Sequence, residues 1–196
     1  NASLMITCLA DALYPGVGEA AVRVLRELGV TVDFPAGQVC CGQPAFNSGY
    51  PDEARAAARA YLRAFAGSEH IVSVSGSCAA MVKVHYPRLF EGRPEWCLAQ
   101  DVARRTFEFS QFIVDVLGGS DLPVACRRRA TFHHSCHTVR MLGVQRQPEA
   151  MIDAIEGLDY VPLPRAEECC GFGGTFAVKL PAVSASLADD KVDSVL

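Results

Sequence analysis

Two Cys-Cys-Gly triplets divide this chain of 196 residues into two similar halves. The first is Cys40-Cys41-Gly42, and the second is Cys169-Cys170-Gly171. A lone cysteine precedes each triplet at nearly the same distance: 31 residues separate Cys8 from the first triplet, and 32 separate Cys136 from the second. A repeat with this spacing predicts two copies of one structural unit, related by pseudo-symmetry.

Hydrophobic periodicity predicts that short strands alternate with helices in both halves. The expected strands are 4–9, 30–34, 71–74, 130–134 and 160–163. The expected helices are 16–28, 51–66, 78–86, 101–117, 149–156 and 182–195, with Ser77 as a cap and Pro87 as a stop for the third. Strands that alternate with helices of this length pair in parallel. We therefore expect an α/β protein made of two small Rossmann-like lobes, each with a parallel sheet in a three-layer sandwich. Gly118-Gly119 is the expected boundary between a first lobe of 1–118 and a second lobe of 119–196.

The charge distribution argues against a nucleic-acid-binding protein. The formal net charge is -4, and Arg127-Arg128-Arg129 is the only dense basic run. No apolar stretch approaches the roughly 20 residues that span a bilayer, and no signal peptide opens the sequence. We therefore expect a cytoplasmic protein without a membrane span. Asn1-Ala2-Ser3 is compatible with a cloning remnant ahead of a native start near Met5.

The nine cysteines indicate metal or redox chemistry more than disulfides. A reducing compartment keeps thiols free, and an odd number cannot all pair within the chain. The vicinal pairs are also poor disulfide partners, because adjacent Cα atoms lie about 3.8 Å apart and disulfides prefer about 4.4–6.8 Å. A ligand role is therefore the more favourable use of the two triplets.

The predicted topology brings distant cysteines together. In a parallel α/β sheet the loops that follow the strands gather at one edge, where such folds bind ligands. Glycine after each vicinal pair permits the irregular turn that aims both sulfurs at one centre. Grouped thiolates select zinc or iron–sulfur clusters, but zinc sites commonly use local C-x2-4-C pairs, which are absent here. The candidate ligands of a multi-iron centre are Cys8, Cys40, Cys41 and Cys78 in the first half, and Cys136, Cys169 and Cys170 in the second.

The complete pattern resembles the cysteine-rich CCG domain family, which includes a component of heterodisulfide reductase, the glycolate oxidase iron–sulfur subunit and the lactate utilization protein A subfamily. The resemblance rests on Cys8, Cys40-Cys41-Gly42, Ser77-Cys78, Cys136 and 168–174, and it covers essentially the whole chain. A short length without a ferredoxin-type cysteine run makes lactate utilization protein A the closest match. The resemblance implies a 4Fe-4S type iron–sulfur subunit that transfers electrons during oxidation of L-lactate or glycolate. Its implied partners are a ferredoxin-type or flavin subunit of the same complex.

Two positions depart from the family pattern. The family motif ends in C-x-x-C, whereas Met81 stands where the last thiolate of the first half would be. In the second half, the counterpart of Cys78 would fall beyond Leu196, so we expect that lobe to be truncated at its C-terminus. Four cysteine ligands thus remain in the first half and three in the second.

Other interpretations of the cysteines remain open. The chain is alternatively a structural zinc-binding or thiol-based interaction module, or a thiol–disulfide enzyme that acts through its vicinal pairs. Cys97 and Cys126 have no partner at the motif spacing and are expected to be ordinary thiols. His133, His134 and His137 surround Cys136, and we expect strand-end or capping roles, with His137 nearest the site.

Overall fold

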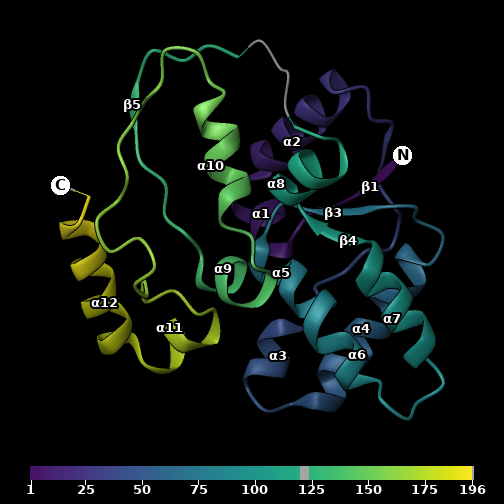
Figure 1. The fold of residues 1–196 in the computed structure, drawn as a ribbon. Helices are drawn as coiled ribbons and strands as arrows, with labels where there is room; N and C mark the ends of the chain where they lie inside the picture. The colour runs from purple at the N-terminus through teal and green to yellow at the C-terminus, as the bar shows by residue number, and fades with distance from the viewer. Residues whose placement is uncertain (120–123, 196) are drawn as a thin grey trace.

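A four-stranded parallel sheet forms the centre of the first half, in the order β2-β1-β3-β4 (Figure 1). The computed structural model describes residues 1–119 and 124–195. The strands are β1 (Ala2–Met5), β2 (Val32–Asp33), β3 (Ile71–Ser73) and β4 (Thr106–Glu108). Ser3 of β1 pairs with Asp33 on one side and with Ile71 on the other. The strand order reverses between β1 and β3, and such a switch point is where open α/β sheets bind ligands.

Helices cover both faces of this sheet and complete three layers (Figure 1). One face carries α4 (Pro51–Phe65), α5 (Gly76–Ala80), the π-helical turn η1 (Met81–His85), α6 (Tyr86–Leu89) and α7 (Trp96–Arg105). The other face carries α2 (Pro15–Glu27), α8 (Phe109–Gln111), the π-helical turn η2 (Phe112–Val116) and α10 (Arg146–Asp153). Two short helices, α1 (Cys8–Leu13) and α3 (Gln43–Asn47), follow β1 and the first Cys-Cys-Gly triplet.

Alternation along the strands separates two hydrophobic clusters. Ile71 joins the cluster under α4 and α7, whereas the next residue, Val72, joins the cluster under α2 and η2. Both side chains are fully buried, and each burial of this kind stabilises the fold by about 1.5–3 kcal/mol. The period of two residues along β3 thus holds both helical layers against one sheet.

The second half has a smaller sheet. Strands β5 (Arg129–Ala130) and β6 (Asp159–Tyr160) pair in parallel, and α9 (Cys136–Leu142) and α10 lie between them in the chain. The last elements are α11 (Thr175–Lys179) and α12 (Pro181–Asp193). Helix α10 packs on α8 and η2 of the first half, and its Met151 contacts the cluster of Val72. The expected α/β class with parallel sheets is confirmed, but within the described residues only the first half forms three layers.

The single helix expected over 101–117 is wrong. Helix α7 ends at Arg105, and β4 interrupts the helical stretch before α8 begins at Phe109. The carboxylate of Glu108 explains the restart, because its Oε2 accepts hydrogen bonds from the backbone N–H groups of Ser110 at 2.8 Å and Gln111 at 3.1 Å. Phe107, which we expected on a helix, therefore lies in a strand.

The first residues belong to the sheet: Ala2 and Ser3 are buried in β1, and the Ser3 hydroxyl donates to Asp33 Oδ1 at 2.7 Å. Two smaller expectations differ from the structure. Ser75, not Ser77, occupies the N-cap of α5. Pro87 does not end the helical stretch, because it lies in the first turn of α6, where its missing N–H costs little. None of the helices in the described part of the chain combines the length and apolar character needed to cross a bilayer.

Candidate cysteine site

The four cysteines predicted in the first half meet beyond the carboxyl ends of three parallel strands. Cys8 opens α1 after β1, Cys40 and Cys41 lie in the loop after β2, and Cys78 lies in α5 after β3. Cys8 Sγ is 3.7 Å from Cys40 Sγ. The Cys41 thiol lies beside Cys40 and Cys78, because it is the neighbour that most lowers the pKa of each. The structure thus joins the four sulfurs in one row, which we call the sulfur row.

Burial and hydrogen bonding give the sulfurs of the row different proton affinities. The neighbouring Cys41 thiol, together with the Gly42 N–H and the Cys8 thiol, lowers the pKa of Cys40 to about 5 against the opposing effect of burial. The pKa of Cys78 is lowered mainly by the same thiol of Cys41. The neighbouring Cys40 and Cys78, together with burial, raise the pKa of Cys41, while burial and the adjacent Cys40 raise the pKa of Cys8. Cys40 and Cys78 are therefore the thiolates that the site favours.

Gly42 shapes the turn that separates the two vicinal sulfurs. Its φ is 81°, and a Cβ at this position would lie 3.0 Å from the backbone oxygen of Ala54 in α4. Only glycine adopts this conformation and this contact without strain. As a result Cys41 is 2% exposed in the core, whereas Cys40 is half-buried at the surface.

Two residues that the sequence analysis did not identify hold the triplet loop in place. The hydroxyl of the fully buried Tyr86 donates to the Cys41 carbonyl oxygen at 2.9 Å. The amide of Gln43 donates to the Ser77 carbonyl oxygen at 3.1 Å and so ties the loop to α5. The position of Gln43 directly after the triplet was the only sequence signal for this role, since the contact partners are 34 and 45 residues away.

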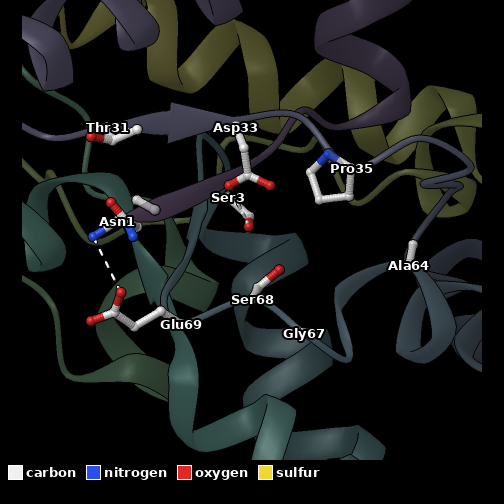
Figure 2. Close-up of a pocket in the computed structure, with 10 residues that line it drawn as sticks. Asn1, Ser3, Thr31, Asp33, Pro35, Ala64, Gly67, Ser68 and Glu69 are labelled. Carbon is white, nitrogen blue, oxygen red and sulfur yellow. Dashed lines mark hydrogen bonds and ion pairs between the residues drawn. The ribbon is translucent and has the colours of Figure 1, made fainter.

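A cavity of about 240 Å³ adjoins the outer end of the sulfur row. Cys8, Asp11, Phe34 and Cys40 are among the residues that line it. A larger cavity of about 560 Å³ lies elsewhere and contains no cysteine (Figure 2). Figure 2 shows Asn1, Ser3, Asp33 and Glu69 around that larger cavity, with an ion pair between Asn1 and Glu69. The smaller cavity is therefore the one that belongs to the candidate site.

The candidate ligands in the sulfur row are all thiols, and each contacts only its neighbours along the row. Met81, which stands in place of a fifth cysteine, is fully buried in the same hydrophobic cluster as Cys41 and Cys78. Among residues 1–119 and 124–195, no three His, Cys, Asp or Glu side chains are grouped so that they could hold one metal ion. The sulfur row thus has the soft donors that suit zinc or iron–sulfur clusters without a ready single-ion geometry.

The cysteines of the second half are less closely assembled. Cys136 opens α9, and its sulfur is 3.5 Å from Nδ1 of His137, the histidine expected nearest the site. The Gly171 N–H donates to Cys169 Sγ at 3.4 Å. No sulfur–sulfur hydrogen bond between these described residues joins Cys136 to Cys169 or Cys170. The second set of candidate ligands therefore stays a prediction, without the sulfur–sulfur contact that the first half shows.

The two triplets nevertheless share one construction. Gly171 has a φ of 78°, close to that of Gly42, and a Cβ there would lie 3.1 Å from the carbonyl carbon of Ser184 in α12. Each triplet is followed by a short helix, α3 or α11, and then by the longer helix that its glycine contacts, α4 or α12. The repeat seen in the sequence is thus a repeat in structure.

The remaining cysteines and histidines lie apart from the sulfur row or pair with other groups. Cys97 is exposed on α7, and the backbone N–H of half-buried Cys126 donates to the Glu156 carbonyl oxygen at 2.9 Å. His134 is buried, and its Nε2 is 3.0 Å from Glu149 Oε1 of α10. All nine cysteines, each within the described residues, are free of disulfides.

Comparison with known proteins agrees with this double construction. A family model described as a cysteine-rich domain, CCG, matches residues 3–83 and 130–196. This chain belongs to the CCG family. Each matched segment contains one triplet and the lone cysteine that precedes it, so the family resemblance noted in the sequence is confirmed for both halves.

Relatives within the CCG family narrow the resemblance further. The chain is 49% identical to lactate utilization protein A of Geobacillus kaustophilus (strain HTA426) over 194 residues, which cover 98% of this chain and 81% of that protein. It is 46% identical to lactate utilization protein A 2 of Bacillus cereus (strain 03BB102), over 98% of this chain and 80% of that protein. It is 47% identical to lactate utilization protein A of Geobacillus thermodenitrificans (strain NG80-2), over 98% of this chain and 81% of that protein. The CCG chain therefore falls in the lactate utilization protein A group.

Proposed function

We propose that this CCG chain is an iron–sulfur electron-transfer subunit of a complex that oxidises a 2-hydroxy acid, L-lactate or glycolate. The observation that carries the proposal is the sulfur row, which gathers thiols from three separate loops at the switch point of a parallel sheet. The relatives bear the name lactate utilization protein A, which favours lactate as the acid. Soft thiolates that are paired along a row suit a multi-iron centre, 4Fe-4S in type, better than one zinc ion.

The residues of the row have distinct parts in this proposal. Cys8, Cys40, Cys41 and Cys78 would hold the first cluster, and a bound cluster would supply a reversible one-electron step. Cys40 and Cys78 lose their protons most readily, as a thiolate ligand must. The Gln43 amide keeps the triplet loop against α5, which contains Cys78, and the Tyr86 hydroxyl holds the backbone of Cys41.

A second cluster would use the cysteines of the second half. Cys136, Cys169 and Cys170 are the candidate ligands there, with Gly171 already placed to donate a hydrogen bond to a sulfur. Hydrogen bonds to cluster sulfurs are one way in which a protein sets a reduction potential. A complete site would need Cys136 and the Cys169-Cys170 pair to bind the same cluster.

Partner subunits follow from the chemistry of the reaction. Oxidation of a 2-hydroxy acid to a 2-keto acid releases two electrons and two protons. A flavin subunit would take both electrons from the acid, and this chain would pass them singly to a ferredoxin-type subunit. The complex would work in the cytoplasm, where thiols stay reduced.

Anaerobic reconstitution with ferrous iron and sulfide tests the proposal. The wild-type chain should gain a visible charge-transfer band and, after reduction, an EPR signal, with iron and sulfide in equal amounts. Cys40→Ser should lose most of the bound iron, because Cys40 is the thiolate that the site favours. Cys97→Ser is the matched control and should bind as much iron as the wild type, since Cys97 is exposed on α7.

Three outcomes would contradict the assignment. A chain that takes up zinc but shows no redox transition would be a structural metal module, because zinc has no accessible redox step. Alkylation that abolishes a thiol–disulfide activity without changing the metal content would indicate the enzyme alternative. Equal iron loss in Cys40→Ser and Cys97→Ser would remove the sulfur row as the ligand set.

A further inference from the structure

The outer end of the sulfur row is a pair of accessible thiols. Cys8 Sγ lies 3.7 Å from Cys40 Sγ, although 31 residues separate the two cysteines in the chain. Cys8 is exposed and Cys40 is half-buried, whereas Cys41 and Cys78 are buried, at 2% and 9% exposed. A small reactive molecule in solution therefore reaches Cys8 and Cys40 before the other two thiols of the row.

The cavity of about 240 Å³ gives both accessible thiols a common approach. Among the described residues that line this cavity, only Cys8 and Cys40 carry sulfur. A water molecule needs only about 10–15 Å³ of such space, so the cavity admits an oxidant as small as hydrogen peroxide. The oxidant and the two sulfurs can thus meet in one place.

A disulfide between Cys8 and Cys40 needs only a small movement. The sulfurs must close from 3.7 Å to about 2.05 Å, so a side-chain shift of less than about 2 Å is enough. Cys8 begins helix α1, in which no residue is buried, so its side chain can turn without disturbing the core. The vicinal pair is a poorer choice, because the Cα atoms of Cys40 and Cys41 are held about 3.8 Å apart.

The thiols outside the sulfur row offer no equivalent pair. Cys97 is exposed on α7, and Cys136 Sγ lies 3.5 Å from His137 Nδ1. Within residues 1–119 and 124–195, no second sulfur–sulfur contact between accessible cysteines accompanies the one between Cys8 and Cys40. The geometry therefore singles out this one pair.

We propose that Cys8 and Cys40 form a redox modification site, at which hydrogen peroxide converts the iron-free chain to a disulfide-linked form. In the first step the peroxide oxidises one thiol of the pair to a sulfenic acid and releases one water. The second thiol then attacks the sulfenic sulfur, which forms the S–S bond and releases a second water. Two electrons pass from the sulfur pair to the peroxide, and a thiol reductant returns them by disulfide exchange.

The disulfide removes two of the four candidate ligands of the sulfur row. This consequence rests on the proposed function, whereas formation of the disulfide does not. A chain without its cluster would be kept in a reversible form, because a thiol in a disulfide does not proceed to the irreversible sulfinic acid. Disulfides in reducing compartments are usually transient and often sense redox conditions. The pair would therefore control when a cluster can be assembled.

Peroxide treatment of the iron-free chain tests the pair. The reduced protein receives an equimolar amount of hydrogen peroxide, the remaining thiols are blocked with iodoacetamide, and the peptides are mapped by mass spectrometry without reductant. Two of the nine free thiols should be lost, and the linked peptide should join Cys8 to Cys40. Dithiothreitol should restore both thiols. A main disulfide between other cysteines, or sulfinic acid at Cys40 beside a free Cys8, would overturn the proposal.

Two serine variants separate this pair from the other thiols. Cys8→Ser should form no disulfide at the equimolar dose, and its Cys40 should proceed to sulfinic acid when more peroxide is added. Cys97→Ser is the matched control, because it removes an exposed thiol outside the row, and it should form the disulfide at the wild-type yield. Equal disulfide yields in the two variants would refute the assignment. The linked peptide of the wild type decides the matter even where a variant does not fold.

The iron-loaded chain distinguishes this inference from the proposed function. If Cys8 and Cys40 hold a cluster, the linked peptide should appear only as the visible charge-transfer band is lost. A disulfide that forms while the band stays intact would support the modification site and contradict the ligand assignment. A chain that gains the band but yields no linked peptide after its iron is removed would contradict the modification site alone.

Discussion

Cys41 organises the site at the scale of single residues. It is the buried member of the vicinal pair, and its neighbours Cys40 and Cys78, together with burial, raise the pKa of its thiol. Cys40 therefore carries the negative charge at the surface end, where it can react. The order of reactivity along the row should follow proton affinity and not exposure.

The pH dependence of alkylation checks this order in the metal-free chain. Because the thiolate is the reactive form and the pKa of Cys40 is lowered to about 5, iodoacetamide should modify Cys40 at pH 6, with a rate that falls only as the pH drops through about 5. Cys8 is more exposed, but its pKa is raised, so it should react more slowly at that pH. Peptide mass spectrometry gives both rates. Faster modification of Cys8 would show that exposure controls the reaction.

At the scale of elements, each triplet loop depends on a glycine that touches a neighbouring helix. Gly42 approaches α4, and Gly171 approaches α12. In both cases the positive φ sets the turn, and the absent Cβ lets the helix pack against the turn. The position of the vicinal sulfurs is thus coupled to the packing of the following helix.

Gly42→Ala measures this coupling. Gly49→Ala is the matched control, because Gly49 also has a positive φ, 84°, but nothing lies within 4 Å of its added Cβ. Gly49→Ala should lose only the cost of placing a side chain at a positive φ, about 1–2 kcal/mol of the free energy of unfolding. Gly42→Ala should lose about 1–3 kcal/mol more, because its Cβ meets the Ala54 carbonyl oxygen. Urea unfolding followed by circular dichroism gives both values. Equal losses would mean that the contact with α4 is unimportant.

At the scale of the whole molecule, helices α9 and α10 of the second half both pack against the first half. Helix α10 packs on the face of the first sheet, and α9 contacts α5 beside Cys78. Gly76 allows the second contact, which brings the helix of Cys136 against the helix of Cys78. The division at residues 118 and 119 remains a prediction, and the shared core argues that the halves fold as one unit.

Gly76→Ala tests the joint between the halves. Its Cβ would collide with the Thr138 side chain, so we expect a loss of about 1–3 kcal/mol in the free energy of unfolding. Gly67→Ala, where nothing lies within 4 Å of the new Cβ, should change that free energy by less than about 0.5 kcal/mol. Adding Thr138→Ala to Gly76→Ala should recover part of the loss. A loss that the second change leaves untouched would place the strain outside this joint.

Much of the fold and of the first site was predictable from local patterns. Apolar runs located β1 and β3, and helical periodicity located α2 and α4 almost to the residue. The number of residues in each strand–helix unit predicted that Cys8 and Cys78 would lie near the triplet loop. Strand β4 was missed because the aromatic residues of 107–112 also fit a helical period, and the capping carboxylate of Glu108 gave no periodic signal.

The sequence by itself determined the double repeat, the parallel α/β class and the set of candidate cysteines, because residue spacing follows directly from helix and strand periods. Only the tertiary structure decided the order of the sulfurs, which depends on the turn at Gly42 and on burial of Cys41. It also decided that α10 of the second half completes the core of the first. Such contacts join residues far apart in the chain, and they form wherever the most apolar surface leaves water, which no local period encodes.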